Sequence, residues 1–65
     1  MTKTIEMLKQ EIRKQSTEQI YDCVITMGGG HVQETERMVR ACLIDVYCER
    51  TSDEDGDKLM DTIGL

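Results

Sequence analysis

Apolar side chains recur at helical spacing along both halves of this chain, and a run of three glycines divides the halves. In the first half, one face of a helical wheel collects a mostly apolar set: Ile5, Leu8, Ile12, Ser16, Ile20, Cys23 and Met27. Because this face stays in phase over the whole segment, the pattern predicts one helix over about residues 4–27.

Two alternatives to this single helix stay open. The four residues from Ser16 to Gln19 match a capping box, which would begin a second helix after a break near Gln15. Residues 20–27 are rich in β-branched and aromatic side chains, which also fits a strand. No other segment is a clear partner for such a strand, and an unpaired strand edge is unfavourable. The helical interpretation is therefore preferred.

The second half predicts a helix over about residues 32–50, but its apolar residues cover more than one face. The main stripe consists of Val32, Thr35, Val39, Cys42, Leu43, Val46 and Tyr47. A helix in a two-helix hairpin needs to bury only one stripe, so the surplus suggests contact with a second copy of the chain or with a partner. The predicted oligomer interface consists of Met38, Ala41, Ile44 and Cys48, with Tyr21 and Ile25 from the first half.

Glycines and capping patterns set the remaining boundaries. Residues 28–30, all glycine in a chain without proline, form the predicted turn between the halves. Thr51 and Glu54 match a second capping box. They predict a short helix over about residues 52–63, with Gly64 as its C-cap and an apolar side made of Leu59, Met60 and Ile63.

These elements predict an all-α fold of one domain, residues 1–65, in which a helical hairpin is followed by a short C-terminal helix. A chain this short buries only about 60% of the surface that it exposes when unfolded. It also contains no Phe or Trp to enlarge the core. Such a core is marginal for a monomer. We therefore expect a homo-oligomer in the form of a dimeric or higher helical bundle.

The net charge of −5 is concentrated near the C-terminus. Residues 51–65 contain one basic residue, Lys58, and five acidic ones: Asp53, Glu54, Asp55, Asp57 and Asp61. One helix start cannot use five carboxylates, so we expect the excess to face a basic surface on a protein partner. Negative charge disfavours non-specific binding to nucleic acid or to an anionic membrane. No apolar run reaches signal-peptide or membrane-spanning length, which indicates a soluble cytoplasmic protein.

The cysteines and His31 do not form a recognisable metal or catalytic motif. Cys23, Cys42 and Cys48 lack the paired spacing of a structural zinc site. In a hairpin that turns at the glycines, Cys23 and Cys42 lie about 10 Å apart along the helix axis, too far to share a metal or a disulfide. We expect no metal, no cofactor, His31 at the surface and Cys48 as the most reactive thiol. No nucleophile is paired with a histidine and a carboxylate, so no catalytic residue and no enzyme activity are predicted.

The glycine turn also suggests an anion site. Gly28, Gly29 and Gly30 precede a predicted helix N-terminus, where free backbone N–H groups can hold an anion. Arg37 and Arg40 follow within that helix and would add positive charge. The segment lacks the Gly-Lys-Ser/Thr of a P-loop, and a flexible turn explains the glycines without a ligand. An oligomer that binds a small anionic ligand at this turn is therefore an alternative function.

Four features of the chain belong together: a short hairpin with a central turn, a Met-Thr-Lys start, the segment Arg40–Leu43 and an acidic tail. In these features the chain resembles Rop, a family of plasmid RNA-binding proteins in which two helical hairpins form a four-helix bundle. The resemblance implies RNA binding by the first helix, through Lys3, Gln10 and Lys14.

The leading functional interpretation is a small acidic, non-enzymatic regulator or inhibitor that acts by binding another protein. Small acidic helical proteins of this kind are common products of phages and plasmids, so such an origin is expected by association. The Rop-like RNA-binding bundle and the binder of a small anion are the alternatives.

Overall fold

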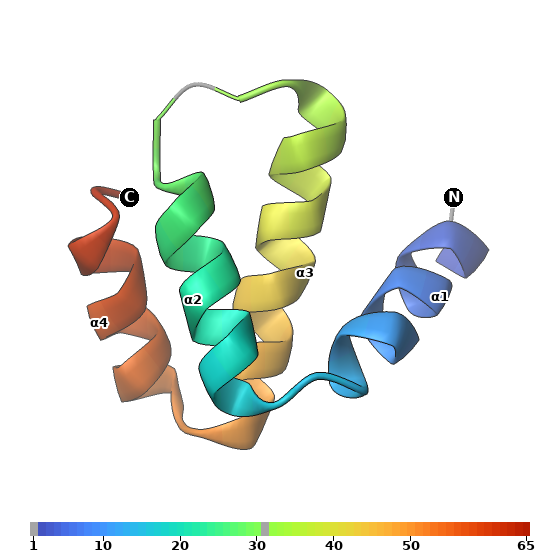
Figure 1. Ribbon diagram of the computed structural model, residues 1–65, viewed down its shortest axis with the longest axis horizontal. Coiled ribbons are helices and arrows are strands. Elements are labelled where there is room, and N and C mark those ends of the chain that lie inside the picture. Colours follow the sequence, from blue (N-terminus) through green and yellow to red (C-terminus); the bar gives the residue numbers. More distant parts are fainter. Residues whose placement is uncertain (1, 31) are drawn as a thin grey trace.

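Four helices make up the computed structural model, which describes residues 2–30 and 32–65, the side chains of Thr2 and Lys3 excepted. Their bounds are α1 Thr2–Arg13, α2 Thr17–Met27, α3 Glu34–Arg50 and α4 Asp53–Thr62. None of the described residues forms a strand, so the all-α prediction is confirmed. α3 is central: α1, α2 and α4 each pack against it, and successive helices alternate in direction (Figure 1).

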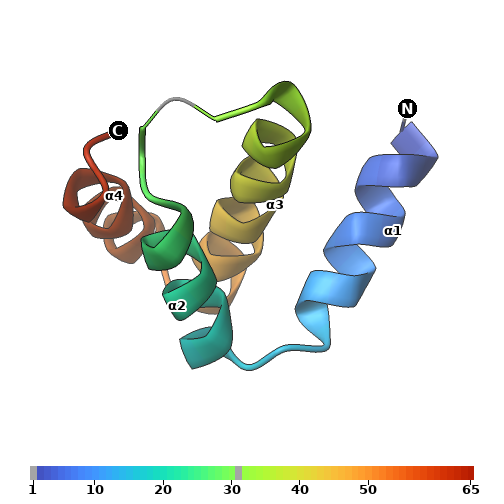
Figure 2. The same ribbon diagram turned by 45° about the horizontal axis from the view of Figure 1, so that its top comes forward.

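The first half of the chain forms two helices, so the prediction of one helix over 4–27 was wrong. α1 ends at Arg13, and Ser16 caps α2. The Ser16 hydroxyl accepts from the Gln19 backbone N–H at 3.1 Å, and the Gln19 side chain accepts from the Ser16 backbone N–H at 3.0 Å. Both halves of the capping box therefore form, and α1 diverges from α2 after the break (Figure 2).

An arginine far away in the sequence holds the end of α1. The guanidinium of Arg50 donates to the backbone carbonyls of Arg13 and Gln15. These carbonyls lie where α1 stops, and the last carbonyls of a helix have no partner within it. The contact stabilises the break, which the capping box at Ser16 defines from the other side.

The break also changes which face of α2 is buried. Ile20 and Val24 are completely buried, whereas Ser16 and Cys23, which were predicted on the apolar face, are exposed. A helix that starts afresh at Ser16 is free to take its own rotation about its axis. The predicted face is therefore correct at Ile20 and at half-buried Met27, and wrong at Ser16 and Cys23, whose place Val24 takes.

α3 supplies half of the buried apolar core. The core consists of Ile12, Ile20, Val24, Cys42, Leu43, Ile44, Val46 and Leu59. Because three helices pack around α3, apolar residues on several of its faces are buried within one chain. This packing accounts for the part of the surplus at Ile44 and Cys48, whereas Ala41 stays exposed.

Two glycines are sites of close backbone approach. A Cβ on Gly29 would overlap the backbone carbonyl of Ile63, and a Cβ on Gly56 would overlap the sulfur of Cys48. The first contact joins the loop after α2 to the end of α4. The second lets α4 lie close against α3. The glycine turn is thus a packing site as well as a bend, with Gly28 at its start in the left-handed region (φ +70°).

The C-terminal helix lies close to its predicted position, although its cap differs. Ser52, and not Thr51, is the N-cap, and its hydroxyl accepts from the Asp55 backbone N–H at 3.1 Å. The Thr51 hydroxyl instead donates to the Tyr47 carbonyl at 2.7 Å. Gly64 follows α4 with φ +83°, as expected for a C-terminal glycine. None of the helices in the described part of the chain combines the length and apolar character needed to cross a bilayer.

Candidate functional site

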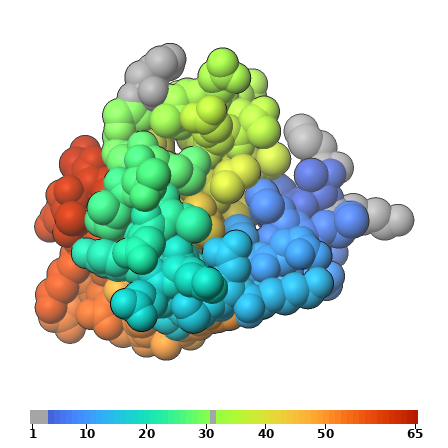
Figure 3. All heavy atoms as spheres, in the orientation of Figure 1, coloured from blue at the N-terminus to red at the C-terminus, as the bar shows by residue number. Residues whose placement is uncertain are grey.

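An apolar groove of about 490 Å³ opens between α1 and α2. Its floor is α3, with Val39 and Leu43, and in the space-filling view α3 is visible between the two diverging helices (Figure 3). α1 and α2 form the walls, with the apolar side chains of Leu8, Ile12, Cys23 and Met27. The groove therefore exists because α1 and α2 both pack on α3 while they spread apart from each other.

The rim of the groove is polar and bears two carboxylates. Glu11 and Asp22 lie on opposite walls, accompanied by Gln15 and Thr26. Glu11 pairs with Lys14 at 3.1 Å, whereas Asp22 has no ion-pair partner among the residues that the structure describes. An uncompensated carboxylate beside an apolar cleft favours a partner that brings a positive charge to that edge.

Ion pairs hold the α1 wall on α3. The ammonium group of Lys9 lies 3.2 Å from the carboxylate of Asp45. One turn further along both helices, Arg13 contacts both carboxylate oxygens of Glu49, at 3.1–3.3 Å. Ile12 is the one buried core residue that α1 adds among those described. Leu8 packs against the same core from a half-buried position. The wall thus combines apolar packing at Ile12 and Leu8 with two charged contacts.

The five acidic residues predicted to bind a partner all lie on α4, away from the groove. Asp53, Asp57 and Asp61 are exposed and follow a spacing of four residues, which places them along one side of the helix. Glu54 approaches Lys58 at 4.0 Å, and Asp55 is half-buried near the N-cap. The three aspartates therefore form an exposed stripe along α4. Glu54, beside Lys58, and half-buried Asp55 do not belong to this stripe.

The six residues of the predicted oligomer interface do not share one environment. Ile44 is buried, and Cys48 is half-buried where Gly56 of α4 crosses it. Ile25 and Tyr21 are exposed on α2, and the Tyr21 ring lies 5.9 Å from that of Tyr47, centroid to centroid. The other two, half-buried Met38 and exposed Ala41, lie on α3. α4 already covers part of this set within the chain.

The backbone carbonyl groups of the glycine turn point toward an arginine side chain. Nη1 of Arg40 donates to the carbonyl of Gly28 at 2.9 Å and to that of Gly30 at 3.3 Å. Arg40 is only 7% exposed. The structure thus brings Arg40 to the glycine turn, but the turn offers carbonyl oxygens where N–H groups were predicted. Arg37 and Arg40 also line a pocket beside α3 and the end of α4.

The three cysteines differ in accessibility. Cys42 is buried, Cys48 is half-buried and Cys23 is exposed in the wall of the groove. Burial raises the pKa of the Cys48 thiol, and the nearby carboxylates of Asp53, Asp45 and Asp57 raise it further. A thiolate is the reactive form, so the structure favours Cys23 over the predicted Cys48 as the most reactive thiol.

Metal-ligating residues do not cluster in the described part of the chain, where no group of three His, Cys, Asp or Glu side chains could hold an ion. His31, predicted at the surface, lies outside the described residues.

The resemblance to Rop would place three residues of the first helix on RNA. Gln10 on α1 and Lys14, directly after α1, are exposed, and Lys14 is paired with Glu11. The side chain of Lys3 lies outside the described part.

No family model, no curated protein and no solved structure matches this chain.

Proposed function

We propose that this protein is a small acidic, non-enzymatic regulator that binds another protein, and that the groove between α1 and α2 is its binding surface. The observation that carries the proposal is the groove itself. Soluble chains rarely leave a contiguous apolar cleft open unless something occupies it. Here six apolar side chains of three helices line one: Leu8, Ile12, Cys23, Met27, Val39 and Leu43.

The shape of the groove favours a helix as the occupant. Two diverging helices on a third leave the position that a fourth helix takes in a bundle. An amphipathic helix laid in such a cleft buries its apolar side at about 25 cal/mol per Å² of apolar surface. Its polar side would stay in water above Glu11 and Asp22.

Charge supports a partner with a basic surface. The chain carries a net charge of −5, and the stripe of Asp53, Asp57 and Asp61 lies outside the groove on α4. Carboxylates at a distance from a contact speed the approach of a basic partner, and their effect weakens with salt. In this proposal the groove supplies the contact and α4 supplies the attraction.

The experiment compares two arginine substitutions on α2. Cys23→Arg places a long cation in the groove wall, and Ile25→Arg places the same side chain at an exposed position that does not line the groove. Wild type and both variants, immobilised at equal density, are used to capture proteins from a host lysate, and the captured partner is then titrated with purified protein. We expect Cys23→Arg to abolish capture and Ile25→Arg to preserve it.

Three other outcomes count against the proposal. Equal capture by both variants would show that the groove is not the binding surface. Loss with Ile25→Arg alone would point to the predicted oligomer interface instead. If light scattering shows that the wild type is a dimer and Cys23→Arg a monomer, then the groove binds a second copy of this chain and not a separate regulator target.

A further inference from the structure

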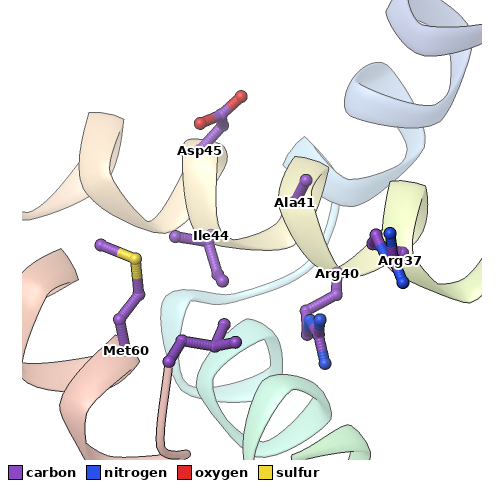
Figure 4. Close-up of a pocket in the computed structure, with 7 residues that line it drawn as sticks. Arg37, Arg40, Ala41, Ile44, Asp45 and Met60 are labelled. Carbon is purple, nitrogen blue, oxygen red and sulfur yellow. The ribbon is translucent and has the colours of Figure 1, made fainter. Parts of the chain in front are cut away.

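A second cavity, of about 290 Å³, lies between α3 and the C-terminal end of α4 (Figure 4). The cavity and the groove have no lining residue in common. Arg37, Arg40, Ala41, Ile44, Asp45, Met60 and Leu65 line it. The lining combines two guanidinium groups with the apolar side chains of two helices, and this combination is the basis of the inference.

Arg40 is a buried cation without an acidic partner. Its side chain keeps only 7% of its surface exposed, and Nη1 is held by the carbonyls of Gly28 and Gly30. No carboxylate of the described residues lies within 4.0 Å of this guanidinium. Buried charges are normally paired, because an isolated charge loses its hydration on burial.

The rest of the Arg40 guanidinium keeps access to the cavity. The bonds to the glycine carbonyls use Nη1. Nε and Nη2 have no hydrogen-bond partner among the described residues, and none of those residues has a polar side-chain atom that is both fully buried and unpartnered. Since Arg40 lines the cavity, we expect a ligand there to meet these N–H groups.

Arg37 adds a second cation on the same side of α3. It precedes Arg40 by three residues, so the two side chains are neighbours on the helix surface, and Figure 4 shows both at one end of the cavity. Asp45, the acidic side chain in the lining, is engaged by Lys9 at 3.2 Å and points away from the two guanidinium groups (Figure 4). An anion at the arginines therefore meets little opposition from it.

The other end of the cavity is apolar. Ile44 is buried, Met60 is half-buried, and Leu65 is 52% exposed although it is a large apolar residue. We infer that this cavity binds a small aliphatic carboxylate, with the carboxylate on Arg37 and Arg40 and the hydrocarbon chain on Ile44, Met60 and Leu65. Guanidinium groups bind carboxylates through paired, charge-assisted hydrogen bonds, and covering apolar surface adds to the affinity.

The test is a titration of the uniformly ¹⁵N-labelled chain with hexanoate, followed by NMR. We expect saturable shifts of the Arg37 and Arg40 side-chain Nε–H signals and of the backbone around Ala41, Ile44 and Met60. Hexanol has the same hydrocarbon chain without the charge, and acetate has the charge without the chain. Both should bind at least about tenfold more weakly than hexanoate, since each lacks one part of the contact.

Two variants and a control locate the site. Arg37→Gln removes one cation and should weaken hexanoate binding about tenfold. Ala41→Phe fills the cavity from an exposed position and should abolish the shifts while both arginines stay in place. Lys14→Gln removes an exposed positive charge elsewhere and should change nothing.

Several results would overturn the inference. Equal shifts with hexanol and hexanoate would show an apolar contact that ignores the charge. Equal weakening by Lys14→Gln and Arg37→Gln would show general charge attraction. Binding that survives Ala41→Phe would place the ligand elsewhere. None of these results depends on the groove, so this site and the proposed protein-binding function stand or fall separately.

Discussion

α1 and α4 both pack against α3, yet different forces hold them there. α4 contributes Leu59, which is 1% exposed, and Gly56, which lets α3 and α4 approach closely at Cys48. α1 buries Ile12, packs half-buried Leu8 beside it, and adds two ion pairs and the contact with the guanidinium of Arg50. One flank of the molecule is held by apolar contact, and the other by a smaller apolar contact with charged contacts beside it.

This difference indicates which of the two helices can move when a partner binds. Exposed ion pairs contribute about 0–1 kcal/mol each, whereas burying a leucine side chain contributes about 1.5–3 kcal/mol. α1 brings two apolar side chains to the core, Ile12 and Leu8, whereas α4 and its C-cap bring three: Leu59, Met60 and Ile63. α1 is therefore the helix that can shift at the lower cost, and it is also a wall of the apolar groove. We expect α4 to behave as part of the core and α1 as an adjustable wall.

The largest expected effect is on the α4 side. Leu59→Ala should lower the free energy of unfolding by about 2–5 kcal/mol, because it empties a completely enclosed position. Urea unfolding followed by far-UV circular dichroism measures the change. Met7→Ala, at a side chain 67% exposed on α1, is the control and should have almost no effect. A small loss for Leu59→Ala would mean that α4 is loosely attached and the comparison fails.

The α1 side has its own apolar anchor, Ile12, which is 4% exposed. Ile12→Ala should cost about 2–5 kcal/mol for docking of α1, but the helices α2, α3 and α4 should stay folded. Amide hydrogen exchange by NMR distinguishes undocking of α1 from unfolding of the other three helices. Protection should fall in α1 and persist in α3. Uniform loss of protection would show that α1 is as integral to the core as α4.

Gly56→Ala tests the close approach of α4 to α3. A methyl group at this position overlaps the Cys48 sulfur, so we expect a loss of about 1–3 kcal/mol in unfolding free energy. Ala is otherwise the better helix former by about 1 kcal/mol. In a Cys48→Ala background the sign should therefore reverse and Gly56→Ala should stabilise. Destabilisation in both backgrounds would assign the glycine a role other than contact with Cys48.

Much of this fold was readable in the sequence because strong local signals carry it. The glycine turn, the α4 helix and the capping box at Ser16 were all visible as patterns of residues. The choice between one and two helices before the turn was harder, since the in-phase apolar face opposed the capping box and the contact of Arg50 with the end of α1 follows only from the tertiary structure. A capping pattern that conflicts with an in-phase apolar face is therefore a reason to expect a break.

The candidate sites were harder to predict than the helices. The groove depends on how far α1 and α2 spread apart, and no local pattern encodes that angle. The apolar surplus of α3, with Ile44 as an example, was visible but was assigned to a second copy because a hairpin has only one seam. Gly56 inside a predicted helix was a usable signal of close packing, yet its partner Cys48 follows only from the tertiary structure.

A smaller effect is expected when the ion pairs of α1 are removed. Glu49→Gln takes away the partner of Arg13 and should cost at most about 1 kcal/mol, because both side chains are about half exposed. Salt should reproduce part of this effect in the wild type. Hydrogen exchange of α1 amides in low and high salt measures it, with α4 as the internal reference. Equal sensitivity of α1 and α4 would contradict the comparison.

The smallest effect is a loss of stability at alkaline pH, and it belongs to the α3–α4 side. Burial raises the pKa of Cys48 above its ordinary 9.0, and burial with the charge of Asp55 raises the pKa of Tyr47 above its ordinary 10.0. A raised pKa means that the folded state holds its proton more tightly than the unfolded state. The resulting stability is complete below pH 9 and is lost as pH rises through the folded-state values.

Urea unfolding at intervals from pH 8 to pH 11 tests this expectation. The unfolding free energy of the wild type should fall as the pH rises, and the slope should be shallower in a Cys48→Ala, Tyr47→Phe double variant. Other groups that titrate in this range contribute equally to both proteins, so the difference between the slopes isolates the two side chains at the α3–α4 contact. Identical slopes would mean that thiol and phenol are as well solvated in the folded chain as in the unfolded one. The tight apolar character assigned to this flank would then be confined to Leu59 and Gly56.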